Sequence, residues 1–235
     1  MTTISEIKQI CQKKTYTKIT KHYRATSYYF TWLFLYFKLT ANQVSALGML
    51  FGVLSTLFFI TNNYYLFILG SFLFYVAMVA DYSDGEVGRF RKYKKLPDEL
   101  YRSHGGFFDS LNHISPPLLF FVMSLSFIHT YNPLLILGVG FINALFRLLL
   151  AGFYDWTNSA LKLLNVHVMD NRRKHDRSSV EKKFRYIYSS LFLPFTIAIF
   201  SIIGIVFNIN AVFYLWIFYA IWGVLLFTLD IFNGR

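Results

Sequence analysis

The sequence predicts an all-α integral membrane protein with six transmembrane helices, and its composition and charge placement support this fold class. Hydrophobic residues make up 55% of the 235 residues and charged residues 15%, whereas about 25% of a typical soluble domain is charged. Three long stretches, residues 39–80, 110–146 and 186–229, contain no Asp, Glu, Lys or Arg. Each stretch has turn-forming residues near its middle, so each is expected to form a helical hairpin that crosses the membrane twice.

The positions of the turns define the expected spans. Asn, Thr, His or Pro residues interrupt the apolar stretches at 61–63, 129–133 and 208–210, and these residue types favour turns. A helix needs about 20 apolar residues to cross the hydrocarbon core. A soluble helical bundle would need a polar stripe on each helix, which these segments lack. The six spans are therefore expected near residues 43–60, 64–82, 107–128, 133–154, 187–207 and 211–230.

The 23 Lys and Arg residues predict the orientation of these spans. They lie in the N-terminal arm, in residues 89–102 and 162–185 and at the C-terminus, with Arg147 just inside the fourth span. None lies in the three turns, so the positive-inside rule places the basic segments and both termini in the cytoplasm. Residues 1–24 are polar and basic, and no cleavable signal is expected there. The expected location is the inner membrane of a bacterial cell.

The region before the first span is expected to lie on the membrane surface. Residues 27–38 are rich in Tyr and Trp and too short to cross, which favours an interfacial helix along the cytoplasmic leaflet. The alternative is an early start of the first span. Residues 1–38 thus form a basic arm and a juxtamembrane amphipathic helix, which anionic lipid attracts; a nucleic-acid partner is not expected. Cys11 is the single cysteine, so an intramolecular disulfide is excluded.

Acidic residues gather where the second and third spans reach the cytoplasm. Asp81, Asp84, Gly85, Gly88 and Arg89 follow the spacing i, i+3, i+4, i+7 and i+8. If the helix continues through them, these residues share one face. The glycines would leave room for a phosphate or nucleotide near the backbone, and the arginine supplies a planar cationic fork. The alternative is a solvated helix end with internal ion pairs.

A second group of polar residues is expected to face the first group from the neighbouring helix. Gly105, Asp109 and His113 share a face at i, i+4 and i+8 at the start of the third span. Two adjacent antiparallel helices can therefore present three carboxylates and an imidazole to one point. Oxygen ligands of this kind suit Mg²⁺ or Mn²⁺, which in turn bind phosphates. Acids near a membrane are costly and usually functional.

The combined pattern resembles the signature of the CDP-alcohol phosphotransferase family. It reads D-x-x-D-G-x-x-G-R from Asp81 and then G-x-x-x-D-x-x-x-H from Gly105, where the family has D-x-x-D-G-x-x-A-R and G-x-x-x-D-x-x-x-D. Residues 39–45 also resemble the T-P-N-x-(S/T) start of the family's first span, with Ala41 in place of proline. The resemblance implies a six-span, cytoplasm-facing membrane enzyme with a juxtamembrane helix, often a homodimer.

The resemblance also implies a reaction and assigns residues to it. The family transfers a phospho-alcohol group from a CDP-linked alcohol to an acceptor hydroxyl and releases CMP, here expected in phospholipid biosynthesis. Residues 39–235 would form the catalytic domain. Asp81, Asp84 and Asp109 would hold one or two Mg²⁺ or Mn²⁺ ions. The nucleotide and its phosphates would be lined by Asn42, Ser45, Gly85, Gly88, Arg89 and Gly105.

Two departures from the family pattern bear on this expectation. His113 stands where the family has the aspartate taken as the general base, and an imidazole can also accept a proton at neutral pH. It could instead be a metal ligand, or the site could be degenerate. The basic gap at residues 90–104 is longer than in the family and could fold over the site, bind an acidic substrate or be a solvated loop.

Several alternatives remain open from the sequence. Arg147 lies about two turns inside the fourth span and could bind an acceptor phosphate or a lipid headgroup, or could snorkel or pair with Asp155. The lipid could be the CDP-linked donor or the acceptor, and a glycan or glycolipid precursor is another possible acceptor. A small channel or transporter would need polar residues at the bilayer midplane, where this chain is mainly apolar.

Overall fold

The computed structural model describes residues 3–11, 18–96, 118–163 and 193–232, and the regular elements in these ranges are α-helices. The predicted all-α class is therefore confirmed for the described residues. The chain divides into two units, Met1–Ser115 and Pro116–Arg235. Unit 1 contains α1 (Ile4–Cys11), α2 (Lys18–Tyr36), α3 (Ala41–Phe59) and α4 (Tyr64–Tyr93). Unit 2 contains a helix over Leu118–Phe127 (helix 118–127), α6 (Pro133–Leu163), α9 (Leu193–Phe207) and α10 (Ala211–Phe232).

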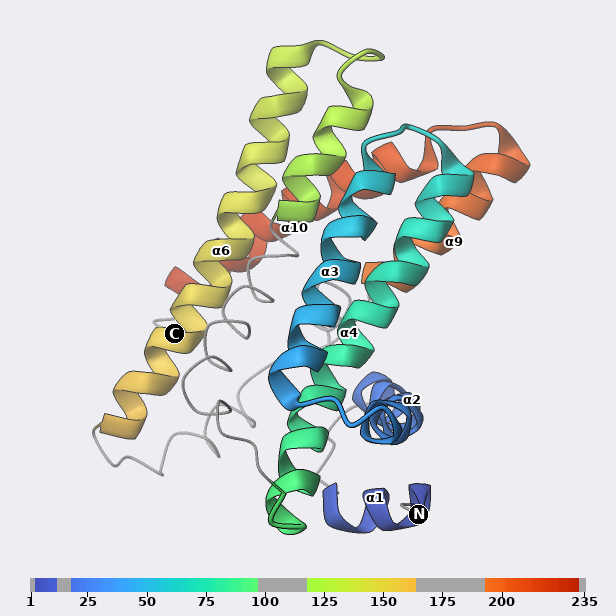
Figure 1. Cartoon of the computed structure of the whole chain (residues 1–235). Coiled ribbons are helices and arrows are strands. Elements are labelled where there is room, and N and C mark those ends of the chain that lie inside the picture. The colour runs from blue at the N-terminus through green and yellow to red at the C-terminus, as the bar shows by residue number, and fades with distance from the viewer. Residues whose placement is uncertain (1–2, 12–17, 97–117, 164–192, 233–235) are drawn as a thin grey trace. The chain divides into compact units, whose positions relative to one another are not determined.

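In unit 1, α3 and α4 form an antiparallel hairpin around the first predicted turn (Figure 1). Thr40 begins α3 with a capping box: its hydroxyl accepts the Gln43 N–H at 3.3 Å, and the Gln43 side chain accepts the Thr40 N–H at 2.9 Å. Asn62 adopts a φ of 50° in the turn, a conformation that asparagine tolerates. Asn63 then caps α4 with its side-chain oxygen. The other two predicted turns also separate helices, at 128–132 and 208–210.

Both helices of this hairpin are long and apolar enough to cross a membrane. Their outer sides carry apolar groups: Leu57 is 55% exposed and Phe72 59% exposed. A hairpin with large exposed apolar side chains is suited to contact with lipid tails. Four shorter apolar helical segments follow in unit 2, over Leu118–Phe127, Pro133–Phe146, Leu193–Phe207 and Ala211–Leu226.

Two of the helices continue beyond the spans that the sequence predicts. α4 extends past residue 82 to Tyr93, and α6 extends past residue 154 to Leu163. The last turns of α4 are stabilised by tertiary contacts, because Glu86, Val87 and Phe90 are buried. The residues from Asp81 to Arg89 therefore lie on one continuous helix, as their proposed common face requires. Parts of the third and fifth predicted spans, residues 107–117 and 187–192, lie outside the described residues.

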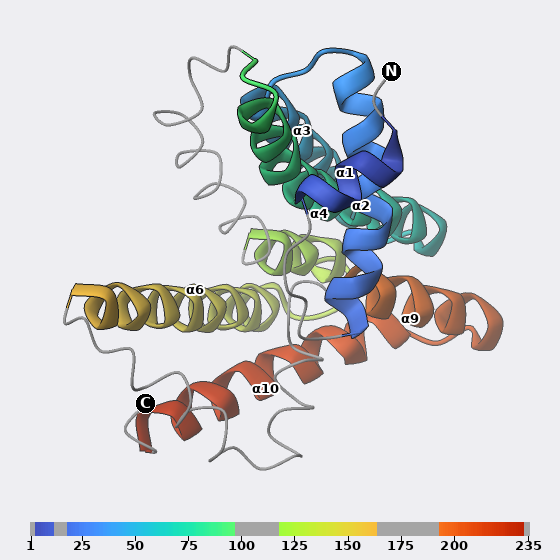
Figure 2. The same ribbon diagram turned by 90° about the horizontal axis from the view of Figure 1, so that it is seen from below.

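α2 crosses α4 instead of running alongside it, as the two views agree (Figures 1 and 2). The prediction of a helix beginning near residue 27 is wrong about its start, since α2 begins at Lys18. Its charged first half is helical because Tyr23 is completely buried. The Tyr23 ring lies 5.1 Å from the Tyr75 ring and 5.8 Å from the Tyr82 ring, both on α4. Tertiary burial thus outweighs the polar composition of this segment.

A sharp stop separates α2 from α3. Lys38 adopts a φ of 58°, its N–H donates to the Leu35 carbonyl at 3.0 Å, and the Leu39 N–H donates to the Phe34 carbonyl at 2.9 Å. This pair of bonds is a Schellman motif, which ends a helix. The alternative that the first span starts early, within residues 27–38, is therefore wrong.

The first residues of the chain, expected to belong to a basic arm, form a short helix. α1 packs against α2 and α4, and it buries Ile7 and Cys11 completely. The Glu6 carboxylate pairs with the Lys94 ammonium at 2.5 Å, at the end of α4. The sequence did not predict this helix because only its docked side is apolar.

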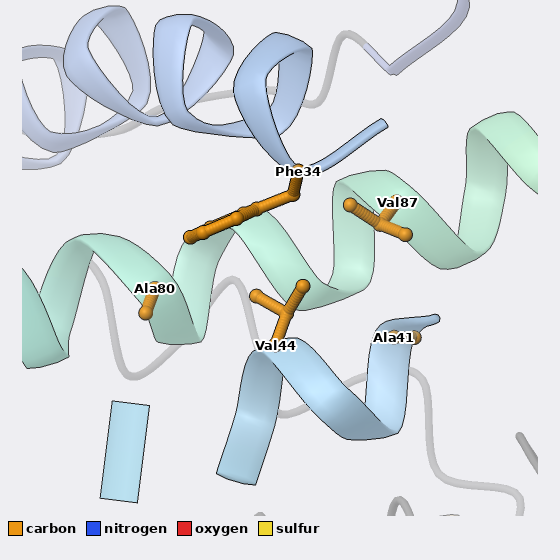
Figure 3. Packing of buried hydrophobic residues seen from close by; sticks show 5 residues of the cluster. All are labelled: Phe34, Ala41, Val44, Ala80 and Val87. Atoms are coloured by element: carbon orange, nitrogen blue, oxygen red, sulfur yellow. The ribbon is translucent and has the colours of Figure 1, made fainter. Parts of the chain in front are cut away.

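The core of unit 1 joins α2, α3 and α4 in one apolar cluster (Figure 3). Phe34 of α2 lies against Ala80 and Val87 of α4, and α3 contributes Ala41 and Val44. α3 and α4 approach closely further along, since a Cβ on Gly48 would lie only 3.2 Å from the Ala80 Cβ. Small residues at this contact let the two backbones pack tightly, as in many membrane helix pairs.

Unit 2 is organised around the indole of Trp216 on α10, which is completely buried. The Trp216 Nε1–H donates to the Phe120 carbonyl of helix 118–127 at 3.0 Å. The Asn143 side chain of α6 donates to the Trp216 carbonyl at 3.3 Å. On α9, the Thr196 hydroxyl lies 3.0 Å from the Tyr219 hydroxyl. α10 therefore contacts each of the other three described helices of this unit.

Two glycines on α6 provide a matched test of the packing in unit 2. A Cβ on Gly140 would lie 2.6 Å from the Ser124 Cβ, whereas a Cβ on Gly138 would meet nothing within 4 Å. We expect Gly140→Ala to destabilise the protein by about 1–2 kcal/mol, because overpacking costs about 1–3 kcal/mol and exceeds a helix-propensity gain of up to about 1 kcal/mol. Gly138→Ala should be neutral or stabilising.

Thermal or denaturant unfolding in detergent micelles, followed by circular dichroism, measures both variants against the parent protein. Equal stability of the two variants would contradict the close approach of α6 and helix 118–127.

Candidate functional site

The described part of the candidate site lies where the first turns of α3 meet the last turns of α4. Asn42 and Ser45 lie near the start of α3, and α4 carries the other described candidates, Asp81, Asp84, Gly85, Gly88 and Arg89. Gly105, Asp109 and His113 lie outside the described residues. Arg147 lies on α6 in unit 2, within the predicted fourth span, and its side chain is not described.

Asp84 and Ser45 are brought into direct contact. The Ser45 hydroxyl donates to Asp84 Oδ2 at 2.5 Å, and Ser45 is only 4% exposed. The contact lies within two turns of the N-cap of α3 at Thr40, where the helix dipole favours a negative charge. The structure thus supports the predicted proximity of the two segments, one from each arm of the hairpin.

Asp81 lies one turn before Asp84, and both carboxylates are half-buried. Their i, i+3 spacing puts them on the same side of α4. Gly48 of α3 faces this turn, since a Cβ there would lie 3.9 Å from the Asp81 backbone nitrogen and 3.2 Å from Ala80 Cβ. The absence of a side chain on Gly48 therefore lets α3 pack closely against the turn that carries the two acids.

The Arg89 side chain folds back along α4 over Gly85. A Cβ on Gly85 would lie 3.2 Å from Arg89 Nη1, so the guanidinium occupies the space beside this glycine that was expected to receive a phosphate. Arg89 is half-buried, and its Nε–H is buried without a hydrogen-bond partner among the described residues. The Arg89 guanidinium, which is the predicted anion-binding group, therefore lies close to the turn of α4 that carries Asp84. Gly88, one residue earlier, is buried.

Glu86 is a further acid on these turns, and its role was not predicted from the sequence. Its side chain is completely buried. Its carboxylate accepts hydrogen bonds from the Ser27 hydroxyl at 2.9 Å and the Thr31 hydroxyl at 2.8 Å, and Arg24 Nη1 lies 3.4 Å away. Ser27 and Thr31, spaced i, i+4 in an aromatic helix, were the sequence signal for a buried polar partner.

Cys11 of α1 lies against the same part of α4. Its Sγ donates to the Glu86 carbonyl at 3.3 Å. Burial raises the pKa of the Cys11 thiol to about 11, and the nearby positive charge of Arg89 opposes this shift without cancelling it. The thiol is therefore protonated at neutral pH, and such buried thiols are chemically inert.

The carboxylates of α4 differ in their capacity to bind a cation. Asp81 and Asp84 fit a hard divalent ion such as Mg²⁺ or Mn²⁺, since they are half-buried oxygen donors one turn apart. Glu86 does not fit, because it is completely buried and both its oxygens accept hydrogen bonds from α2. Among the described residues, no three His, Cys, Asp or Glu side chains converge on one point.

The start of the basic segment 90–104 is structured. Residues 90–93 are the last turn of α4, and Phe90 is buried with Ile7, Cys11 and Tyr28. The interpretation of this segment as a solvated loop is therefore wrong for its first four residues. A Schellman motif at Lys95, with a φ of 55°, ends the helix.

Comparison of the chain with protein-family models, with curated protein sequences and with solved structures gives no match.

The buried position of Cys11 makes a prediction that one thiol reagent can test. The protein has a single cysteine, so labelling by N-ethylmaleimide reports this site alone. At pH 8 we expect labelling of the folded protein to be at least about 100-fold slower than that of a free cysteine, because its pKa is about 11 and an ordinary thiol has a pKa of about 8.5. The rate should rise as the pH approaches 11.

The control is Cys11→Ser combined with Lys21→Cys, which moves the thiol to an exposed position on α2. Equal labelling rates at pH 8 in the two proteins would contradict the docking of α1 on α4.

Proposed function

We propose that this protein is a six-span membrane enzyme that transfers a phospho-alcohol group from a CDP-linked alcohol to an acceptor hydroxyl and releases CMP. The proposal is carried by the Asp81–Asp84 pair on α4, its contact with Ser45 of α3, and the adjacent Arg89. These residues belong to the motif that resembles the CDP-alcohol phosphotransferase signature. Both termini and the site would face the cytoplasm, in the inner membrane of a bacterium, and the enzyme would act as a homodimer in phospholipid biosynthesis.

Acidic residues and an arginine have separate proposed roles in binding the donor. Asp81, Asp84 and Asp109 would hold one or two Mg²⁺ or Mn²⁺ ions, with His113 as a further candidate ligand. A bound ion would neutralise the pyrophosphate and the charge that develops in the transition state. Arg89, held beside the Asp84 turn, supplies a permanent positive charge for the same phosphates.

The remaining candidates would bind the nucleotide and move the proton. Asn42 and Ser45 on α3, with Gly85, Gly88 and Gly105, would line the cytidine and phosphate pocket. His113 would accept the proton of the acceptor hydroxyl, whose oxygen then attacks the phosphorus that carries the retained alcohol. The new phosphorus–oxygen bond forms as the bond to CMP breaks, and CMP leaves with the pair of electrons. Arg147 is a candidate for binding an acceptor phosphate or a lipid headgroup.

The proposed metal site predicts a large effect of one isosteric substitution. Asp84→Asn keeps an oxygen that can accept the Ser45 hydrogen bond but removes the charge that a divalent ion needs. We expect it to lower Mn²⁺-dependent CMP release by about 100-fold or more, because changes even to the groups that surround metal ligands cost about 10–100-fold. Glu6→Gln is the matched control, because it removes a carboxylate of the same unit from the pair with Lys94.

The assay uses the purified full chain in detergent with Mn²⁺ and two substrate sets. One set pairs CDP-diacylglycerol with small alcohols, and the other pairs diacylglycerol or a glycan precursor with CDP-linked small alcohols. CMP release from none of the pairs, or full activity of Asp84→Asn, would refute the proposal.

A histidine substitution separates donor binding from proton transfer. We expect His113→Ala to lower kcat about 10²–10⁴-fold, the usual contribution of general acid–base catalysis, while the affinity for the CDP-linked donor stays within about threefold. His129→Ala, in an exposed turn, is the control and should retain full turnover. Turnover is measured as CMP release, and donor affinity by isothermal calorimetry. An unchanged kcat would remove His113 from the proposed role.

A further inference from the structure

The Glu86 carboxylate connects α4 to α2 on the side of α4 away from Asp84. Residues two positions apart differ by about 200° around a helix axis, so Asp84 and Glu86 leave α4 in nearly opposite directions. Asp84 Oδ2 accepts the Ser45 hydroxyl of α3 at 2.5 Å. Glu86 Oε2 accepts the Thr31 hydroxyl of α2 at 2.8 Å. One turn of α4 is thus held from two sides, by two different helices.

The contacts of Glu86 use directional groups that the sequence places one turn apart. Ser27 and Thr31 are both completely buried, and the Ser27 Oγ lies 2.9 Å from Glu86 Oε1 and 3.0 Å from Oε2, so its hydroxyl can donate to either oxygen. Ser83 of α4 returns a hydrogen bond to the Ser27 carbonyl at 3.2 Å. Arg24 supplies the opposite charge at 3.4 Å and lies over the Tyr82 ring.

Apolar packing alone does not fix how α4 is rotated about its axis. Phe34, Ala80 and Val87 bring α2 and α4 together (Figure 3), but hydrophobic contact is non-directional. Hydrogen bonds to a carboxylate weaken steeply when their angles change. The bonds from Ser27 and Thr31 are therefore the directional contacts that set the rotation of α4 against α2 at the turn that carries Asp84 and Glu86, whereas the Tyr75–Thr26 bond lies about three turns earlier on α4.

We propose that Glu86 is a positioning residue that holds α2 on α4 and fixes the setting in which Asp84 meets Ser45. Its expected effect on turnover rests on the proposed function, whereas its effect on the Asp84–Ser45 contact does not. A rotation of α4 would displace Asp81, Asp84 and Arg89 together. A displacement of about 1 Å at a reacting centre can cost about 100-fold in rate.

Turnover is tested first in a double-mutant cycle. Glu86→Ala should lower kcat for CMP release about 100-fold, with the KM for the CDP-linked donor within about threefold. Ser27→Ala with Thr31→Val, which leaves α4 unchanged, should produce the same loss. All three substitutions together should cost no more than either set alone, because both sets remove the same hydrogen bonds between Glu86 and the hydroxyls of Ser27 and Thr31. Losses that multiply in the combined variant would overturn the proposal.

Two further variants separate positioning from general destabilisation. The kcat of Glu86→Gln should be at least about tenfold higher than that of Glu86→Ala, since the glutamine amide oxygen still accepts the Thr31 hydrogen bond. Thr26→Val is the matched control on α2: it removes a different bond to α4, from the Tyr75 hydroxyl at 3.0 Å. Its kcat should stay within about twofold of the parent value, and a loss as large as that of Glu86→Ala would overturn the proposal.

A second measurement does not depend on any enzymatic activity. In a Cys11→Ser background, Ser45→Cys places one thiol at the Asp84 contact, where Ser45 is 4% exposed. Adding Glu86→Ala should speed its labelling by N-ethylmaleimide at least about tenfold, because Asp84 moves away and solvent enters. Ser55→Cys, completely buried further along α3, is the control and should label at an unchanged rate.

The two measurements distinguish the failure of each proposal. If the parent protein releases no CMP, the proposed function fails, and faster labelling at position 45 alone still supports positioning by Glu86. If labelling at position 45 is unchanged, or speeds up equally at position 55, the positioning role is overturned whatever the turnover.

Discussion

The burial of the Glu86 carboxylate imposes a constraint on which much of unit 1 depends. Removing a carboxylate from water costs several kcal/mol unless a cation and hydrogen-bond donors compensate. Both oxygens of Glu86 accept hydrogen bonds from hydroxyls of α2, and Arg24 provides the cation. α2 must therefore cross α4 with Ser27 and Thr31 directed at this one side chain. The position of Phe34 over Ala80 and Val87 then follows, because it lies on the same helix a turn further on.

A different helix contacts the last turns of α4 on each side, and each of these helices meets α4 through a different type of residue. α3 approaches through Gly48 and Ser45, α2 through the polar pair at 27 and 31, and α1 through Cys11. An apolar side chain that such a contact removes from water contributes about 1.5–3 kcal/mol. The polar contacts contribute less net energy but are directional, and they determine which side of α4 each neighbour meets.

Local patterns in the sequence predict the features of this fold that depend on neighbouring residues. The hairpin turn at Asn62 follows from turn chemistry, and the single face from Asp81 to Arg89 follows from helix periodicity. The start of α2 at Lys18 could not be predicted, because that segment is polar and becomes helical only by burying Tyr23 between two tyrosines of α4. The Glu86 contacts were missed for the same reason. Periodicity places Glu86 on a face but does not identify the helix that meets that face.

The three acids on α4 show how environment separates residues of one chemical type. Glu86 is completely enclosed, and its hydrogen-bonding capacity is used by α2, so a cation could reach it only if that helix left. Asp81 and Asp84 are only half-buried beside the small residues of α3, so neither is enclosed by a neighbouring helix as Glu86 is. A buried structural carboxylate is stable only when hydrogen bonds or a paired charge satisfy its oxygens. A carboxylate that binds a metal ion must instead keep part of its surface accessible to the ion. On this criterion the two aspartates are the candidates for a metal site, and Glu86 is the group proposed to keep their helix in place.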